Sequence, residues 1–76
     1  MNKQVLADGN LSWESSYEIA LALMQKYPQG NLEDVSLGDI FNWTIALDNF
    51  NDEAELANDS ILASIYQDWF EELNPL

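Results

Sequence analysis

The sequence predicts an all-α fold, a small three-helix bundle. Apolar residues recur at spacings of three and four positions in three separate segments, which is the period of amphipathic helices. The chain has only 76 residues, so it is expected to form one domain, and the connections between the three segments are short. A hydrophobic content of 47% with so regular a period argues against a disordered chain.

The first helix is predicted over residues 16–27. Ser15 and Glu18 have the S-x-x-E spacing of a capping box, which places the start of the helix. Pro28 ends it, because proline cannot continue the helical hydrogen bonding. Just before this helix, Leu11 or Trp13 is expected to lie against the first turn.

The second helix is organised around one apolar stripe, which spans an arc of roughly 80° on a helix of 3.6 residues per turn. The stripe consists of Ile40, Trp43, Leu47 and Phe50. We expect Ser36 or Gly38 to precede the helix, Asp39 to lie in its first turn, and the helix to end near Phe50.

The third helix is predicted over residues 60–73, with Asn58 or Asp59 as its N-cap and Pro75 shortly after its end. Between the second and third helices, Leu56 is expected to anchor the acidic connection inward. Residues 31–38 read as an extended linker. Residues 1–10 show no period and are expected to be a flexible tail, which leaves residues 11–76 as the single domain.

Composition excludes several kinds of chemistry. The chain contains no Cys and no His, so thiol nucleophiles and the commonest general bases and transition-metal ligands are missing. Neither lysine lies in an apolar stretch that would lower its pKa, and we expect no enzymatic activity. No segment approaches the roughly 20 apolar residues of a membrane span, and the N-terminus lacks the pattern of a secretory signal. A cytoplasmic location is therefore expected.

The charge balance is the strongest feature of the composition. Fourteen acidic residues face two basic ones, Lys3 and Lys26, which gives a formal net charge of −12. A field of this sign repels phosphate backbones and anionic membranes, so nucleic acid and membrane partners are not expected. It attracts cations and basic protein patches.

Part of the acidic charge is a candidate metal site. Asp48 and Asp52 are four positions apart, so they share one face if the second helix continues that far. Carboxylates without His or Cys bind hard or borderline divalent cations weakly. The alternative is that both side chains simply point into water.

A docking surface is the other candidate. Phe41, Ile45 and Asp48 lie on the face of the second helix opposite its core stripe, and large apolar groups beside a carboxylate are typical of a partner contact. The alternative is that this face packs on the third helix. The complete set of predicted partner-binding residues is Phe41, Ile45, Asp39, Glu55, Asp59, Glu71 and Glu72.

The order and spacing of several motifs resemble those of the IscX proteins of bacterial iron–sulfur cluster assembly, over about residues 11–73. The motifs are Trp13-Glu14-Ser15-Ser16-Tyr17-Glu18-Ile19, Tyr27-Pro28, Asp39, Trp43, Leu47, Phe50-Asn51-Asp52-Glu53, Asn58-Asp59, Ile61-Leu62, Ile65 and Trp69.

The resemblance implies a modified winged-helix domain, weak binding of ferrous iron by surface carboxylates, and docking on the cysteine desulfurase IscS. The acidic run of the family maps onto residues 51–54, where the first position is the amide Asn51 and Ala54 replaces the usual proline. The predicted metal ligands are Asp48, Asp52 and Glu53, and the predicted metal is weakly bound, exchangeable Fe(II). The predicted function is that of a monomeric adaptor or regulator of cluster assembly. The alternative is an acidic protein-interaction module without a metal, for example a nucleic-acid mimic.

Overall fold

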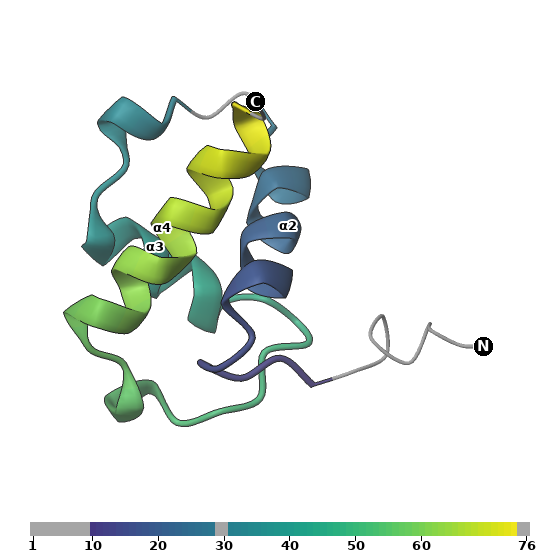
Figure 1. Cartoon of the computed structure of the whole chain (residues 1–76). Helices are drawn as coiled ribbons and strands as arrows, with labels where there is room; N and C mark the ends of the chain where they lie inside the picture. The colour runs from purple at the N-terminus through teal and green to yellow at the C-terminus, as the bar shows by residue number, and fades with distance from the viewer. Residues whose placement is uncertain (1–9, 29–30, 75–76) are drawn as a thin grey trace.

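The computed structural model describes residues 10–28 and 31–74, and this part of the chain is helical (Figure 1). Its elements in chain order are α2 (Ser16–Lys26), the 3₁₀ turn η1 (Leu32–Asp34), α3 (Leu37–Ile45), the 3₁₀ turn η2 (Ala54–Leu56) and α4 (Asp59–Leu73). The predicted class, a small all-α three-helix bundle, is confirmed. Extended pairing within the described residues is limited to one bridge between Leu11 and Phe50.

Helix α4 lies across the other two helices and closes the core (Figure 1). It packs more extensively on α2 than on α3. The fully buried side chains at the centre come from all three helices and include Ile19, Leu23, Ile40, Ile65 and Trp69. Large side chains such as these give a small domain most of the apolar area that it can bury.

The helix starts were predicted with mixed success. The capping box expected at Ser15 and Glu18 is wrong, because the Ser15 hydroxyl accepts from the backbone N–H of Ser12 at 3.3 Å and makes no cap on α2. A capping box is found instead on α3, where the Asp39 N–H donates to Ser36 Oγ and the Ser36 N–H donates to Asp39 Oδ2, both at 3.0 Å. Asn58 caps α4 as predicted.

Helix α3 ends at Ile45, and its predicted continuation to Phe50 is wrong. The chain turns at residues 46–49, and the backbone on either side of Phe50 then pairs with Leu11. A helix through this region would forfeit those bonds, and asparagine and aspartate favour turns over helix interiors. The core stripe nevertheless holds, since Leu47 is buried and Phe50 packs against the core.

Two smaller expectations also need correction. Leu56 is 55% exposed, because Ala54 and Ala57, three positions apart, lie on the inner side of the 3₁₀ turn and leave Leu56 outside. The linker over residues 31–38 is not extended throughout, since it contains η1. The predicted flexible tail lies outside the described residues except for Asn10, which is exposed.

Candidate functional site

Trp13 joins the start of the domain to the acidic connection between α3 and α4. Its ring is buried, stacked on Phe41 with centroids 6.0 Å apart and edge-on to Phe50 at 4.6 Å. The indole Nε1–H donates to the backbone carbonyl of Glu53 at 2.8 Å. The indole therefore has an apolar body in the core and a polar tip that fastens the acidic connection.

Backbone bonds reinforce this junction. The Leu11 N–H donates to the Asn49 carbonyl and the Asn51 N–H donates to the Leu11 carbonyl, both at 2.8 Å. We call the contact between residues 11–13 and residues 49–53 the Trp13 clamp. It joins segments about 40 positions apart in the chain, so it fixes the position of the acidic residues that follow α3.

Asp52 belongs to this clamp. Its Oδ2 accepts from the backbone N–H of Trp13 at 3.0 Å, and its Oδ1 accepts from the N–H of Glu53 at 2.7 Å. Both carboxylate oxygens therefore satisfy backbone donors, and the side chain is half-buried. Asp52 acts as a structural acceptor at a place where the sequence suggested a surface ligand.

The three predicted metal ligands are not assembled into one site. Asp48 is exposed in the turn after α3, Asp52 is held in the Trp13 clamp, and Glu53 is exposed. Because α3 stops at Ile45, Asp48 and Asp52 do not share a helical face. Within residues 10–28 and 31–74, no group of three acidic side chains is arranged to hold a metal ion. These residues do not fit a ready-made ferrous site.

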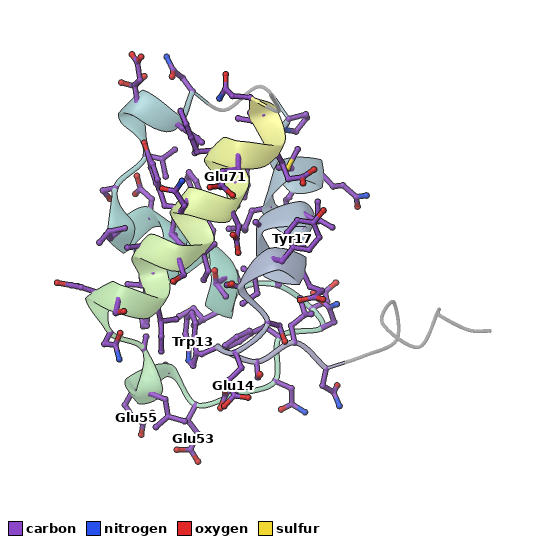
Figure 2. All side chains as sticks on the ribbon, viewed as in Figure 1. Trp13, Glu14, Tyr17, Glu53, Glu55 and Glu71 are labelled. Atoms are coloured by element: carbon purple, nitrogen blue, oxygen red, sulfur yellow. The ribbon has the colours of Figure 1, made fainter. Side chains whose placement is uncertain are left out.

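Exposed carboxylates do gather beside the Trp13 clamp. Figure 2 shows Glu14, Glu53 and Glu55 at the end of the molecule where Trp13 lies, and all three are exposed. We call these three residues the acidic end. Glu14 was not among the predicted site residues, because its proximity to Glu53 arises from the clamp and leaves no local signal in the sequence.

The apolar docking face predicted on the second helix is only partly exposed. Phe41 is half-buried and stacked on Trp13, so it belongs to the packing of the clamp. Ile45 is 40% exposed at the last position of α3. Asp39 is half-buried, and its carboxylate is engaged in the capping box of α3. The alternative stated above was that this face is buried against the third helix. Phe41 is indeed partly buried, but it packs on Trp13.

The acidic residues of α4 lie at both ends of the helix. Asp59 begins α4, whereas Glu71 and Glu72 lie near its C-terminal end. Asp59 and Glu71 are twelve positions apart, which corresponds to about 18 Å along the helix. The predicted partner-binding set therefore does not form one surface. Glu72 also accepts from the Tyr17 hydroxyl at 2.9 Å, and Asp68 accepts from the Ser16 hydroxyl at 2.8 Å. These two bonds join α4 to the start of α2.

The hydrogen bond to Glu72 changes the pKa of Tyr17, and this change can be tested by titration. The pKa of Tyr17 is raised above its ordinary value of 10.0, first by its hydrogen bond to Glu72 and then by the negative charge of that carboxylate. The folded state thus holds the phenolic proton more tightly than the unfolded state. The resulting stabilisation is complete below pH 10 and is lost as the pH rises through the folded-state pKa.

We expect Glu72→Gln to bring the pKa of Tyr17 back toward 10.0. Tyrosinate absorbance measures this titration, and the difference between wild type and Tyr17→Phe isolates the signal of Tyr17. A Tyr17 titration that is the same in the wild type and in Glu72→Gln would contradict the assignment.

The fold and site define a class of protein: a small acidic three-helix domain whose exposed carboxylates at one end are held in place by a buried tryptophan. No described helix has the length and apolar character that a membrane crossing requires.

The sequence matches the iron–sulphur cluster assembly family over residues 11–74. The chain belongs to this family, the IscX family, and so has a role in iron–sulfur cluster assembly. It is also 29% identical over 63 residues to the uncharacterized protein PA3808 of Pseudomonas aeruginosa; the match covers 83% of this chain and 96% of that protein.

Proposed function

We propose that this protein docks through its acidic end on a basic patch of a cysteine desulfurase and thereby regulates cluster assembly. The observation that carries the proposal is the position of Glu14, Glu53 and Glu55, which are exposed together beside a rigid junction. Membership of the cluster assembly family supports the choice of partner. The protein acts as an adaptor in this proposal, with no catalytic step of its own.

The physical basis of the docking is electrostatic. A net charge of −12 on 76 residues steers the protein toward cationic surfaces and raises the association rate. The Trp13 clamp keeps the backbone beneath the acidic end in one arrangement, so less conformational entropy is lost on binding. Solvent-exposed charges are screened beyond about 8 Å at physiological salt, so the affinity should fall as ionic strength rises.

Charge reversal tests where the docking surface lies. We expect Glu53→Lys with Glu55→Lys to weaken binding to the desulfurase about tenfold or more, because rim charges set association and complementarity. A matched control, Glu18→Lys with Asp34→Lys, changes the net charge by the same amount outside the acidic end. Titration calorimetry at several salt concentrations measures both variants. Equal losses in the two variants, or an affinity that ignores salt, would contradict docking at the acidic end.

Iron is a separate part of the proposal. Ferrous iron is proposed as a weak, exchangeable ligand of surface carboxylates, and the docking does not depend on it. An anaerobic Fe(II) titration followed by NMR tests this part: selective broadening or shifts at Asp48, Asp52 and Glu53 would support the ligands that the sequence suggests. If iron reaches Asp52, the indole N–H resonance of Trp13 should change as well, because both residues belong to the clamp.

A metal-independent interaction module is the second candidate function. It is favoured by the lack of a three-carboxylate group among the described residues and by the engagement of both Asp52 oxygens. The same titration separates the candidates: uniform, very small shifts across all carboxylates support the second.

A cation that binds only the folded form at 100 times its dissociation constant would add about 2.7 kcal/mol of stability, which a thermal melt detects.

A further inference from the structure

Helix α4 has a second surface, at the end of the molecule away from the acidic end. Two adjoining hollows of about 430 and 330 Å³ follow α4 where it faces η1 and the start of α3. Tyr66 lines both hollows, so they meet at its side chain, and we call the two hollows together the α4 groove. The lining residues of α4 and of its C-cap are spaced along one helical face: Ala63, Tyr66, Gln67, Phe70, Leu73 and the C-cap Asn74.

The α4 groove has a mixed lining, which includes large exposed apolar side chains. Phe70 and Leu73, three positions apart, are 46% and 45% exposed. Removing large apolar side chains from water is favourable, so a partner that covers these two would be stabilised. Leu32, Val35 and Leu37 line the opposite wall. Exposed apolar groups that gather in a concave surface mark an interaction site more often than isolated exposed ones do.

One hydrogen bond joins the two sides of the α4 groove where the two hollows meet. The Tyr66 hydroxyl donates to the backbone carbonyl of Leu32 at 2.9 Å, which fixes η1 against α4. In Figure 1, η1 stands beside the C-terminal half of α4, at the end opposite the connection between α3 and α4. Figure 2 likewise places Glu71 well away from Glu53 and Glu55. The α4 groove and the acidic end are therefore separate surfaces.

Charge decides among the possible occupants. Glu33 lines the groove, Asp34 and Glu71 are exposed next to lining residues, and the described lining contains no Lys or Arg. A second copy of this chain would bring another net charge of −12 to the contact, and nucleic acids and anionic membranes would be repelled for the same reason. A cationic partner with an apolar face satisfies both the floor and the rim.

The dimensions identify the form of the partner. From Ala63 to Asn74 the groove follows eleven helical steps, or about 16 Å, which is three turns of helix. We infer that the α4 groove binds a short amphipathic helix of a basic partner protein, with apolar side chains at i, i+3 or i+4, and i+7 against Phe70 and Leu73. This helix-in-groove mode is a common form of peptide recognition. The inference stands apart from the docking on a desulfurase, and it would let the protein join two partners.

The probe is a twelve-residue helical peptide of leucine and lysine with leucine at i, i+3, i+4 and i+7. We expect NMR shifts at Leu32, Tyr66, Phe70 and Leu73. We also expect Phe70→Ala with Leu73→Ala to weaken binding at least tenfold. Both substitutions lie at exposed helix positions, where alanine favours the helix. Leu56→Ala removes an apolar side chain from η2 that is exposed to a similar or greater degree, and it should change the affinity by less than twofold.

A second peptide, with every leucine replaced by serine and the same charge, isolates the apolar part of the contact. It should bind at least tenfold more weakly. Equal binding of the two peptides, or unchanged binding by the Phe70 and Leu73 variant, would overturn the inference. Concentration-dependent dimerisation through Phe70 and Leu73, seen by sedimentation, would assign the groove to a second copy and also overturn it. So would a tenfold gain in peptide affinity on deletion of residues 75–76, since the chain's own end would then be the occupant.

Discussion

Replacing Trp13 by alanine is expected to lower the free energy of unfolding by about 3–5 kcal/mol, the usual cost of removing a buried tryptophan. The ring is only 3% exposed, and it contacts both Phe41 and Phe50. At about 0.05–0.15 kcal/mol per residue, a 76-residue domain has a total stability of about 4–11 kcal/mol. The loss is therefore a large share of the total. Urea unfolding followed by circular dichroism measures it.

Trp13→Phe separates packing from hydrogen bonding in the same position. Phenylalanine keeps an aromatic body against Phe41 and Phe50 but cannot donate to the Glu53 carbonyl. We expect a smaller loss, since one intramolecular hydrogen bond contributes about 0.5–1.5 kcal/mol and the smaller ring also leaves some space. Equal stability of Trp13→Ala and the wild type would show that the Trp13 clamp does not hold the fold together.

The clamp also has a functional consequence. Trp13 fastens the backbone at Glu53, and Glu14 follows it directly, so loss of the indole should loosen the acidic end. At a temperature where Trp13→Phe is still folded, its affinity for the desulfurase should fall while its charge stays the same. Binding that responds to this neutral change would support a docking surface ordered by the clamp.

The local signals in the sequence predicted the presence of three helices and, within one residue, the bounds of α2 and α4. Asn58 before α4 and Pro75 after it bracket a helix whose apolar period is unbroken, and its observed bounds differ from the prediction by one residue. The core stripe of Ile40, Trp43, Leu47 and Phe50 was also identified, because burial follows the apolar period even where the backbone leaves the helix. These features depend on neighbours within a few positions.

The Trp13 clamp could not be predicted in the same way. Its bonds join residues 38 to 40 positions apart, and no periodic pattern reports contacts at that separation. The helical period therefore carried the predicted second helix through residues 46–50, where pairing with Leu11 prevails. The misplaced helix end in turn brought Asp48 and Asp52 onto one face in the prediction. Asp52 looked like a surface ligand because a carboxylate's hydrogen-bond partners are not visible in its neighbouring residues.

Asp52→Ala is expected to cost about 2–3 kcal/mol of unfolding free energy, because hydrogen bonds to a charged group contribute about 1.5–3 kcal/mol. The substitution leaves the backbone N–H of Trp13 without its acceptor in a part of the fold that is largely buried. The Glu53 N–H also loses its acceptor, but Glu53 is exposed and water can replace it. Chemical denaturation measures the change, and the hydrogen exchange of the Trp13 amide shows whether the clamp has opened.

Asp48→Ala is the matched control, since it removes the same charge from an exposed position in the turn after α3 and should change stability by less than about 0.5 kcal/mol. The pair also distinguishes the two roles assigned to Asp52. If Asp52 were mainly a metal ligand with no structural role, Asp52→Ala in the absence of metal would reduce repulsion among neighbouring carboxylates. The Asp52→Ala and Asp48→Ala variants would then be equally stable. A loss confined to Asp52→Ala, present without any cation, identifies this carboxylate as the acceptor that positions the acidic end.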